Sequence, residues 1–182
     1  MATENVLSYF LNDFKSTSVN WNSLPDIYLY MDQILTYLDV QLKPFKVNEK
    51  EKLLTSSMIN NYVKDHVIPK PENKKYNKNH LAKLIEICAL KQTLNVLEIK
   101  HLFEISEANQ NDETQYHVFS ESQRNAFEGV SKRVSETVTN LDSAKAKEEL
   151  LKLLMELINE SNARRIASVK ILEYLRNTNT AT

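Results

Sequence analysis

The sequence predicts an all-α protein, and three observations carry that prediction. Only one glycine, Gly129, occurs among the 182 residues, which leaves few positions for the tight turns that connect strands. Apolar residues recur at spacings of three and four along most of the chain, as they do on one face of a helix. Hydrophobic residues make up 42% of the total, which is enough for a packed core.

Two helices are predicted in the N-terminal part, over residues 3–15 and about 23–40. In the second, Ser23 is a plausible N-cap with Pro25 in the first turn, and Pro44 interrupts the helical pattern. The apolar faces consist of Leu7, Phe10, Leu11 and Phe14 in the first helix and Ile27, Met31, Ile34, Leu35 and Leu38 in the second. We expect these helices to precede the central domain as an extension.

A short third helix is predicted over about 54–66, with Thr55 as its cap and Met58 and Tyr62 facing inward. Its outward positions are small and polar. After it, Pro69 and Pro71 stand one residue apart and exclude a helix. Residues 67–76 are therefore expected to form a basic loop or a small two-stranded wing.

The next helices are expected to begin at Asn77 and near Asn95. Residues 105–118 are polar, have almost no apolar period and are predicted to be a linker. Ser120 and Gln123 form a capping-box pair that would open a long helix, which two further helices, over about 144–158 and 162–176, would follow. The expected parts are a helix-turn-helix domain with its extension (1–104), a linker (105–118) and a C-terminal helical region (119–182).

Charge is distributed unevenly along the chain, although the net charge is only −1. Residues 43–101 hold twelve lysines against six acids, a balance of +6, whereas the segments on either side are acidic. A basic centre between acidic flanks favours contact with a polyanion in the middle of the chain. Chance segregation of charge on a solvated face is the alternative.

The basic centre contains residue types that read DNA. Asparagine pairs with adenine, and lysine neutralises phosphates without reading sequence. The candidate DNA-contacting residues are Ser57, Asn60, Asn61, Tyr62 and Lys64 on the short helix and Lys70, Lys74, Lys75 and Lys78 after it. From spacing alone, an ordinary amphipathic helix followed by a solvated loop is an equal alternative.

This region resembles two families, and the resemblance rests on residues 55–64, 67–71 and 74–81. More closely, residues 25–103 resemble an uncharacterised bacterial family catalogued as domain of unknown function 1836. More distantly, residues 53–103 resemble the winged helix-turn-helix of MerR-type transcriptional regulators, although Asn60 stands where that pattern has arginine. The second resemblance implies a MerR-like core in which Tyr62 and Lys64 contact phosphate and Lys74 is the basic position of a wing.

Other chemistry finds little support in the sequence. Cys88 is the only cysteine, so neither an intrachain disulfide nor a zinc ribbon can form. No nucleophile, carboxylate-pair or phosphate-loop motif appears, and we expect neither an enzyme nor a bound cofactor or metal. We find no membrane-spanning stretch and no signal peptide, which favours a cytoplasmic protein. The alternative function is a helical protein-interaction module that does not bind DNA.

A homodimer is the expected assembly. The segment 150–158 is apolar around most of its circumference, and such a helix needs neighbours on more than one side. Regulators that use a helix-turn-helix usually pair two copies to read two half-sites. The C-terminal helices would hold the dimer, and an intramolecular bundle in a monomer is the alternative. No sequence feature identifies a small-molecule effector.

Overall fold

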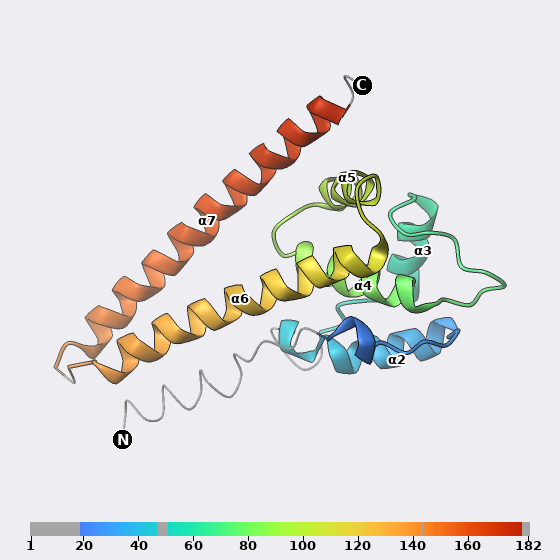
Figure 1. Cartoon of the computed structure of the whole chain (residues 1–182). Helices are drawn as coiled ribbons and strands as arrows, with labels where there is room; N and C mark the ends of the chain where they lie inside the picture. The colour runs from blue at the N-terminus through green and yellow to red at the C-terminus, as the bar shows by residue number, and fades with distance from the viewer. Residues whose placement is uncertain (1–18, 47–50, 143, 180–182) are drawn as a thin grey trace.

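The computed structural model describes residues 19–46, 51–142 and 144–179, and these form an all-α protein, as predicted (Figure 1). The helices are η1 (Trp21–Ser23), α2 (Met31–Gln41), η2 (Lys43–Phe45), α3 (Ser56–Lys64), α4 (Lys78–Leu90), α5 (Val96–Glu107), α6 (Asp112–Thr139) and α7 (Ala146–Asn179). No helix among the described residues has an apolar stretch of the length that a bilayer requires.

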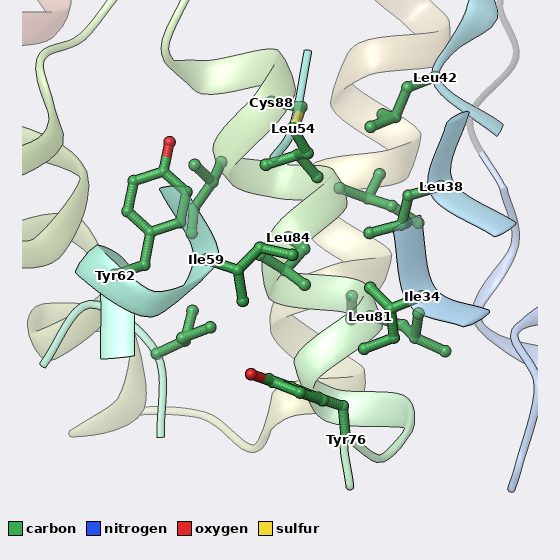
Figure 2. Close-up of a cluster of buried hydrophobic side chains, with 14 of the residues drawn as sticks. Ile34, Leu38, Leu42, Leu54, Ile59, Tyr62, Tyr76, Leu81, Leu84 and Cys88 are labelled. Atoms are coloured by element: carbon green, nitrogen blue, oxygen red, sulfur yellow. The ribbon is translucent and has the colours of Figure 1, made fainter. Parts of the chain in front are cut away.

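Helix α4 is the centre of the larger core. Every residue from His80 to Cys88 is buried, and Leu81 and Leu84 are completely enclosed. Figure 2 shows Ile34 and Leu38 of α2 on one side of α4 and Ile59 of α3 on the other. Its three buried polar residues, His80, Lys83 and Glu86, recur every third position and each has a hydrogen-bond partner.

The long helices α6 and α7 form a hairpin that extends away from this core (Figure 1). A second, smaller cluster joins them, built from Val134, Val138 and Leu153 with four partly buried neighbours, Val130, Leu141, Leu150 and Leu157. Arg133 of α6 adds hydrogen bonds to Glu156 and Glu160 of α7.

Three predicted helix starts are confirmed together with their caps. The Thr55 hydroxyl accepts from the backbone N–H of Met58 at the start of α3. Asn77 and Asn95 cap α4 and α5 in the same way, and each forms a reciprocal pair with the third helical residue, His80 or Glu98. Residues 67–76 contain no helix, also as predicted.

The predicted start of the second helix at Ser23 is wrong, because α2 begins at Met31. Leu24 precedes Pro25 and is extended, with ψ of 137°, as the steric demand of proline requires. Leu29 then pairs with Tyr76 in an antiparallel bridge instead of continuing a helix. The predicted helix over residues 3–15 lies outside the described residues.

The predicted linker over 105–118 is also wrong in its secondary structure. Helix α5 continues to Glu107 and α6 already begins at Asp112, capped by Asn111, whose side chain accepts from Thr114. Ser120, expected as a cap with Gln123, lies inside α6, and its hydroxyl donates to the carbonyl of His117. Much of α6 is exposed to solvent, so its sequence is polar and lacks the apolar period from which a helix is predicted.

The two helices predicted over 144–158 and 162–176 are one continuous helix, α7. The polar residues Asn159–Asn162 contain neither proline nor glycine, so nothing stops the backbone hydrogen bonding between the two halves. The all-round apolar character noted in 150–158 remains visible. Leu153 is buried against α6, whereas Leu151, Leu154, Met155 and Ile158 are each at least half exposed.

Candidate nucleic-acid interface

Helix α3 presents one apolar and one polar face. Ile59 is fully buried and anchors the helix in the core. The candidate residues Ser57, Asn60, Asn61 and Lys64 are all exposed. The structure therefore places small polar side chains and one lysine together on the solvent side of a short, capped helix.

Tyr62 does not belong to that exposed face. Its side chain is only 6% exposed and lies in the core between α3 and α4 (Figure 2). Burial raises the pKa of its hydroxyl above the ordinary value. The resemblance to MerR regulators implied a phosphate contact at this position, but the side chain instead packs inward, as the helical spacing predicted. We therefore remove Tyr62 from the candidate interface.

The end of α3 turns sharply without a glycine. His66 adopts a left-handed φ of 56°, and the backbone N–H of Val67 donates to the carbonyl of Tyr62 at 2.8 Å. The N–H of His66 donates to Val63, which completes a Schellman motif. Val67 and Ile68 then bury their side chains, so the basic loop starts from a fixed position.

A tight turn forms at the tip of the loop, between Glu72 and Lys75. Asn73 and Lys74 have φ of 49° and 63°, and the N–H of Lys75 donates to the carbonyl of Glu72 at 2.8 Å. Two consecutive left-handed residues define a type I′ turn, the form that joins hairpin strands. The flanking pairs are isolated bridges, so the described residues hold a hairpin turn but not the two strands of a wing.

His80 fastens the loop to α4. Its Nδ1 accepts from the backbone N–H of Asn77, and its Nε2 lies 3.2 Å from the carbonyl oxygen of Pro69, to which it can donate. Burial lowers the pKa of His80 and outweighs the bond to Pro69, which raises it. The ring also packs edge-on against Tyr76 at 5.3 Å.

The lysines of this region fall into two groups. Lys64, Lys70 and Lys74 are exposed, and none of them forms an ion pair within the described part of the chain. Lys75 and Lys78 are half-buried, and their ammonium groups lie over the rings of Tyr30 (5.2 Å) and Trp21 (4.8 Å). Sequence reasoning missed both ring contacts because the partners lie far away along the chain.

The connection that precedes α3 departs from the usual motif. A helix-turn-helix joins its two helices by a turn of about three to four residues. Here residues 42–55 separate α2 from α3 and include the short helix η2. The apolar side chains Leu42, Leu53 and Leu54 are buried along this connection, which keeps the two helices packed together despite its length.

The fold and this surface define a class: an all-helical domain with a capped short helix, a basic hairpin turn and a buried central helix. The chain belongs to the family described as domain of unknown function DUF1836, whose profile matches residues 19–127. The match covers every described helix up to the first half of α6 and excludes α7. No curated protein and no solved structure matches the chain.

Proposed function

We propose that this protein is a DNA-binding transcriptional regulator with a MerR-like arrangement, rather than an enzyme. Helix α3 acts as the recognition helix, and the turn at Glu72–Lys75 acts as the wing. One observation carries the proposal: the exposed polar face of α3 is followed directly along the chain by a fixed loop with two exposed lysines, Lys70 and Lys74, which form no ion pair with any described residue.

The chemistry of the two parts differs. Asn60 and Asn61 can each give and accept a hydrogen bond, so they suit the paired donor and acceptor of adenine in the major groove. Lys64, Lys70 and Lys74 present mobile charges that suit phosphates, which supply affinity without sequence information. Lys75 and Lys78 lie over aromatic rings, and these contacts position the turn. Their charges also contribute to the electrostatic potential of the surface.

The direct test is the salt dependence of binding to a random pool of duplex DNA. We expect log K to fall by about 0.9 with log salt for each phosphate neutralised. The variant Lys70→Ala/Lys74→Ala should therefore flatten the slope by roughly two units if each lysine contacts one phosphate. The matched control, Lys152→Ala/Lys170→Ala, removes two exposed lysines of α7 and should leave the slope unchanged.

A second measurement separates base reading from phosphate contact. Replacement of Asn60 or Asn61 by alanine should relax the preferred sequence selected from the pool, with little change in the salt slope. If the wild-type protein binds no duplex from the pool at low salt, the DNA proposal is contradicted. The polar face of α3 would then be assigned to a protein-interaction module.

We further propose that the working unit is a homodimer held by α7. Leu151, Leu154, Met155 and Ile158 lie along one side of α7 that no described helix covers. We call these four residues the α7 stripe. A second copy suits it because a stripe on a straight helix is self-complementary about a two-fold axis. Two-fold pairing would also place two α3 helices to read paired half-sites.

Light scattering coupled to size exclusion tests the dimer. The wild type should have the mass of two chains at micromolar concentration, and Leu154→Glu/Met155→Glu should have the mass of one. Ala163→Glu adds a charge at an exposed position on another side of α7 and should remain dimeric. A wild-type mass of one chain at every concentration would rule out the dimer.

A further inference from the structure

A cavity of about 660 Å³ lies where α4, α5, α6 and α7 meet. Its walls are mostly small or apolar, and they include Ala89, Leu90, Leu102, Phe103, Phe119 and Leu157. Cavities of roughly 300–1,000 Å³ with a few converging polar groups are typical of small-molecule sites. The walls from α4 and α5 belong to the matched family domain, whereas α7 supplies a wall from outside it.

The polar groups of this cavity include buried acceptors. The carboxylate of Glu86 lies in the wall and is only 2% exposed as a residue. The side-chain N–H of Gln115 donates to it at 3.0 Å, which leaves Gln115 Oε1 free to accept. The Oε1 atoms of Gln115 and Gln123 are buried and accept no hydrogen bond from any described residue. Buried acceptors without donors are costly and favour a ligand that supplies donors.

The charges around Glu86 also favour a cation. Lys83 is the one lysine beside it, and its ammonium group already pairs with Glu107 at 2.5 Å and Asp112 at 3.4 Å. Three acids therefore stand against one lysine. The α7 wall also carries two arginines, which are exposed: Arg164 lies 3.6 Å from Glu160, and Arg165 donates to the backbone carbonyl of Thr93.

We propose that this cavity binds a small organic amine, whose protonated amino group donates to Glu86 and Gln115 and whose apolar body fills the remainder. A primary ammonium group has three donors, which suffice for the carboxylate oxygens of Glu86 and for Oε1 of Gln115. The apolar body would pack against Leu90, Phe119 and the other apolar side chains of the wall. This inference does not depend on DNA binding.

Calorimetric titration of the full chain with matched pairs of compounds tests the proposal. The pairs are tryptamine with indole-3-acetate, 4-phenylbutylamine with 4-phenylbutyrate, and octylamine with octanoate. Each pair keeps one apolar body and exchanges a cation for an anion. We expect at least one amine to bind, and to bind at least about tenfold more tightly than its partner acid, because hydrogen bonds to charged groups are stronger than those between neutral groups.

Two variants locate the binding. Glu86→Gln keeps the shape of the side chain but removes its charge, and it should weaken amine binding about tenfold or more. The control Glu104→Gln removes an exposed acid of α5 outside the cavity and should change nothing. Ala126→Trp fills the cavity from an exposed position on α6, so it should abolish binding.

Three outcomes would overturn the proposal: no amine binds at millimolar concentration, the acids bind as tightly as the amines, or Ala126→Trp binds as well as the wild type. None of them bears on the DNA proposal, because the titrations contain no nucleic acid. Circular dichroism of each variant establishes that a loss of binding reflects the site and not an unfolded chain.

Discussion

Leu29 and Tyr76 exchange two backbone hydrogen bonds, each of 2.8 Å, although they lie far apart along the chain. Leu29 stands just before α2, and Tyr76 follows the hairpin turn just before α4. The pair fixes the base of the turn, and the ring of Tyr30 beside it receives the ammonium group of Lys75. The position of the basic turn is therefore set from the N-terminal part of the domain.

The backbone of that turn suits glycine at position 74. Lys74 has a φ of 63°, in the left-handed region that costs other residues roughly 1–2 kcal/mol. Glycine relieves this strain, but it also loses more backbone entropy on folding than lysine does. The net effect of Lys74→Gly should be a rise of about 0.5–1 kcal/mol in the free energy of unfolding. The same change should weaken DNA binding because a charge is lost.

Lys70→Gly is the matched control, since it removes a charge where no left-handed φ occurs. It should weaken DNA binding without a gain in stability. Chemical denaturation and DNA titration of both variants check this prediction, and a less stable Lys74→Gly would contradict the turn geometry.

The contact between Tyr30 and Lys75 should appear in a double-mutant cycle. The changes are Tyr30→Leu and Lys75→Met, separately and together. Cation–π pairs at exposed sites contribute about 0.5–1 kcal/mol, and we expect a coupling free energy of that size. The control cycle uses Tyr28→Leu in place of Tyr30→Leu. Tyr28 is exposed and forms no such contact with Lys75, so this cycle should give a coupling free energy close to zero. Equal coupling in both cycles would exclude the contact.

Glu86 should make stability depend on pH. Burial raises its pKa to about 7 from 4.5, against the opposing effects of Lys83 and Gln115, with Asp112 and Glu107 also facing it. The folded protein then holds a proton that the unfolded chain has lost, so the contribution is complete below pH 4.5 and falls as the pH rises to 7. At about 1.4 kcal/mol per pH unit, the loss is on the order of 3 kcal/mol.

Comparison with Glu86→Gln isolates this effect, because glutamine cannot titrate. The free energies of unfolding should agree near pH 4, and the variant should gain relative to the wild type up to about pH 7. Glu104→Gln, at an exposed position, serves as the control. A difference that does not change between pH 4 and 8 would show that Glu86 is not held in this environment.

The start of α6 can be tested at its cap. Asn111→Ala removes the side chain that accepts from Thr114 and should cost about 1 kcal/mol. Ser120→Ala removes a hydroxyl that bonds only within the helix, so its cost should be smaller. Thermal unfolding of both variants measures the difference. If Ser120→Ala cost more than Asn111→Ala, the helix would begin where the sequence pattern placed it.

The predictions that were confirmed depended on local chemistry. Thr55, Asn77 and Asn95 each stand directly before a helix and cap it, and two prolines exclude a helix from the loop between α3 and α4. Such signals act over three or four residues, so the sequence shows them directly. The outward positions of α3 followed from the same local spacing.

The parts that were wrong depended on distant partners. Nothing near Leu29 shows that it pairs with Tyr76, which replaces the expected first turns of a helix. The polar start of α6 is helical because Tyr116 is completely buried in the larger core, a contact that its polar neighbours conceal. The cavity likewise joins four helices, and Glu86 stands in no recognisable motif.

The uninterrupted course of α7 has a mechanical consequence. The helix contains 34 residues without proline or glycine, about 50 Å of rod at 1.5 Å per residue, and so has no hinge. Its middle section walls the cavity, and the α7 stripe lies toward its N-terminal end. Any molecule that tilts α7 when it enters the cavity must swing the stripe by the same angle. In the proposed dimer, such a tilt would change the separation of the two α3 helices.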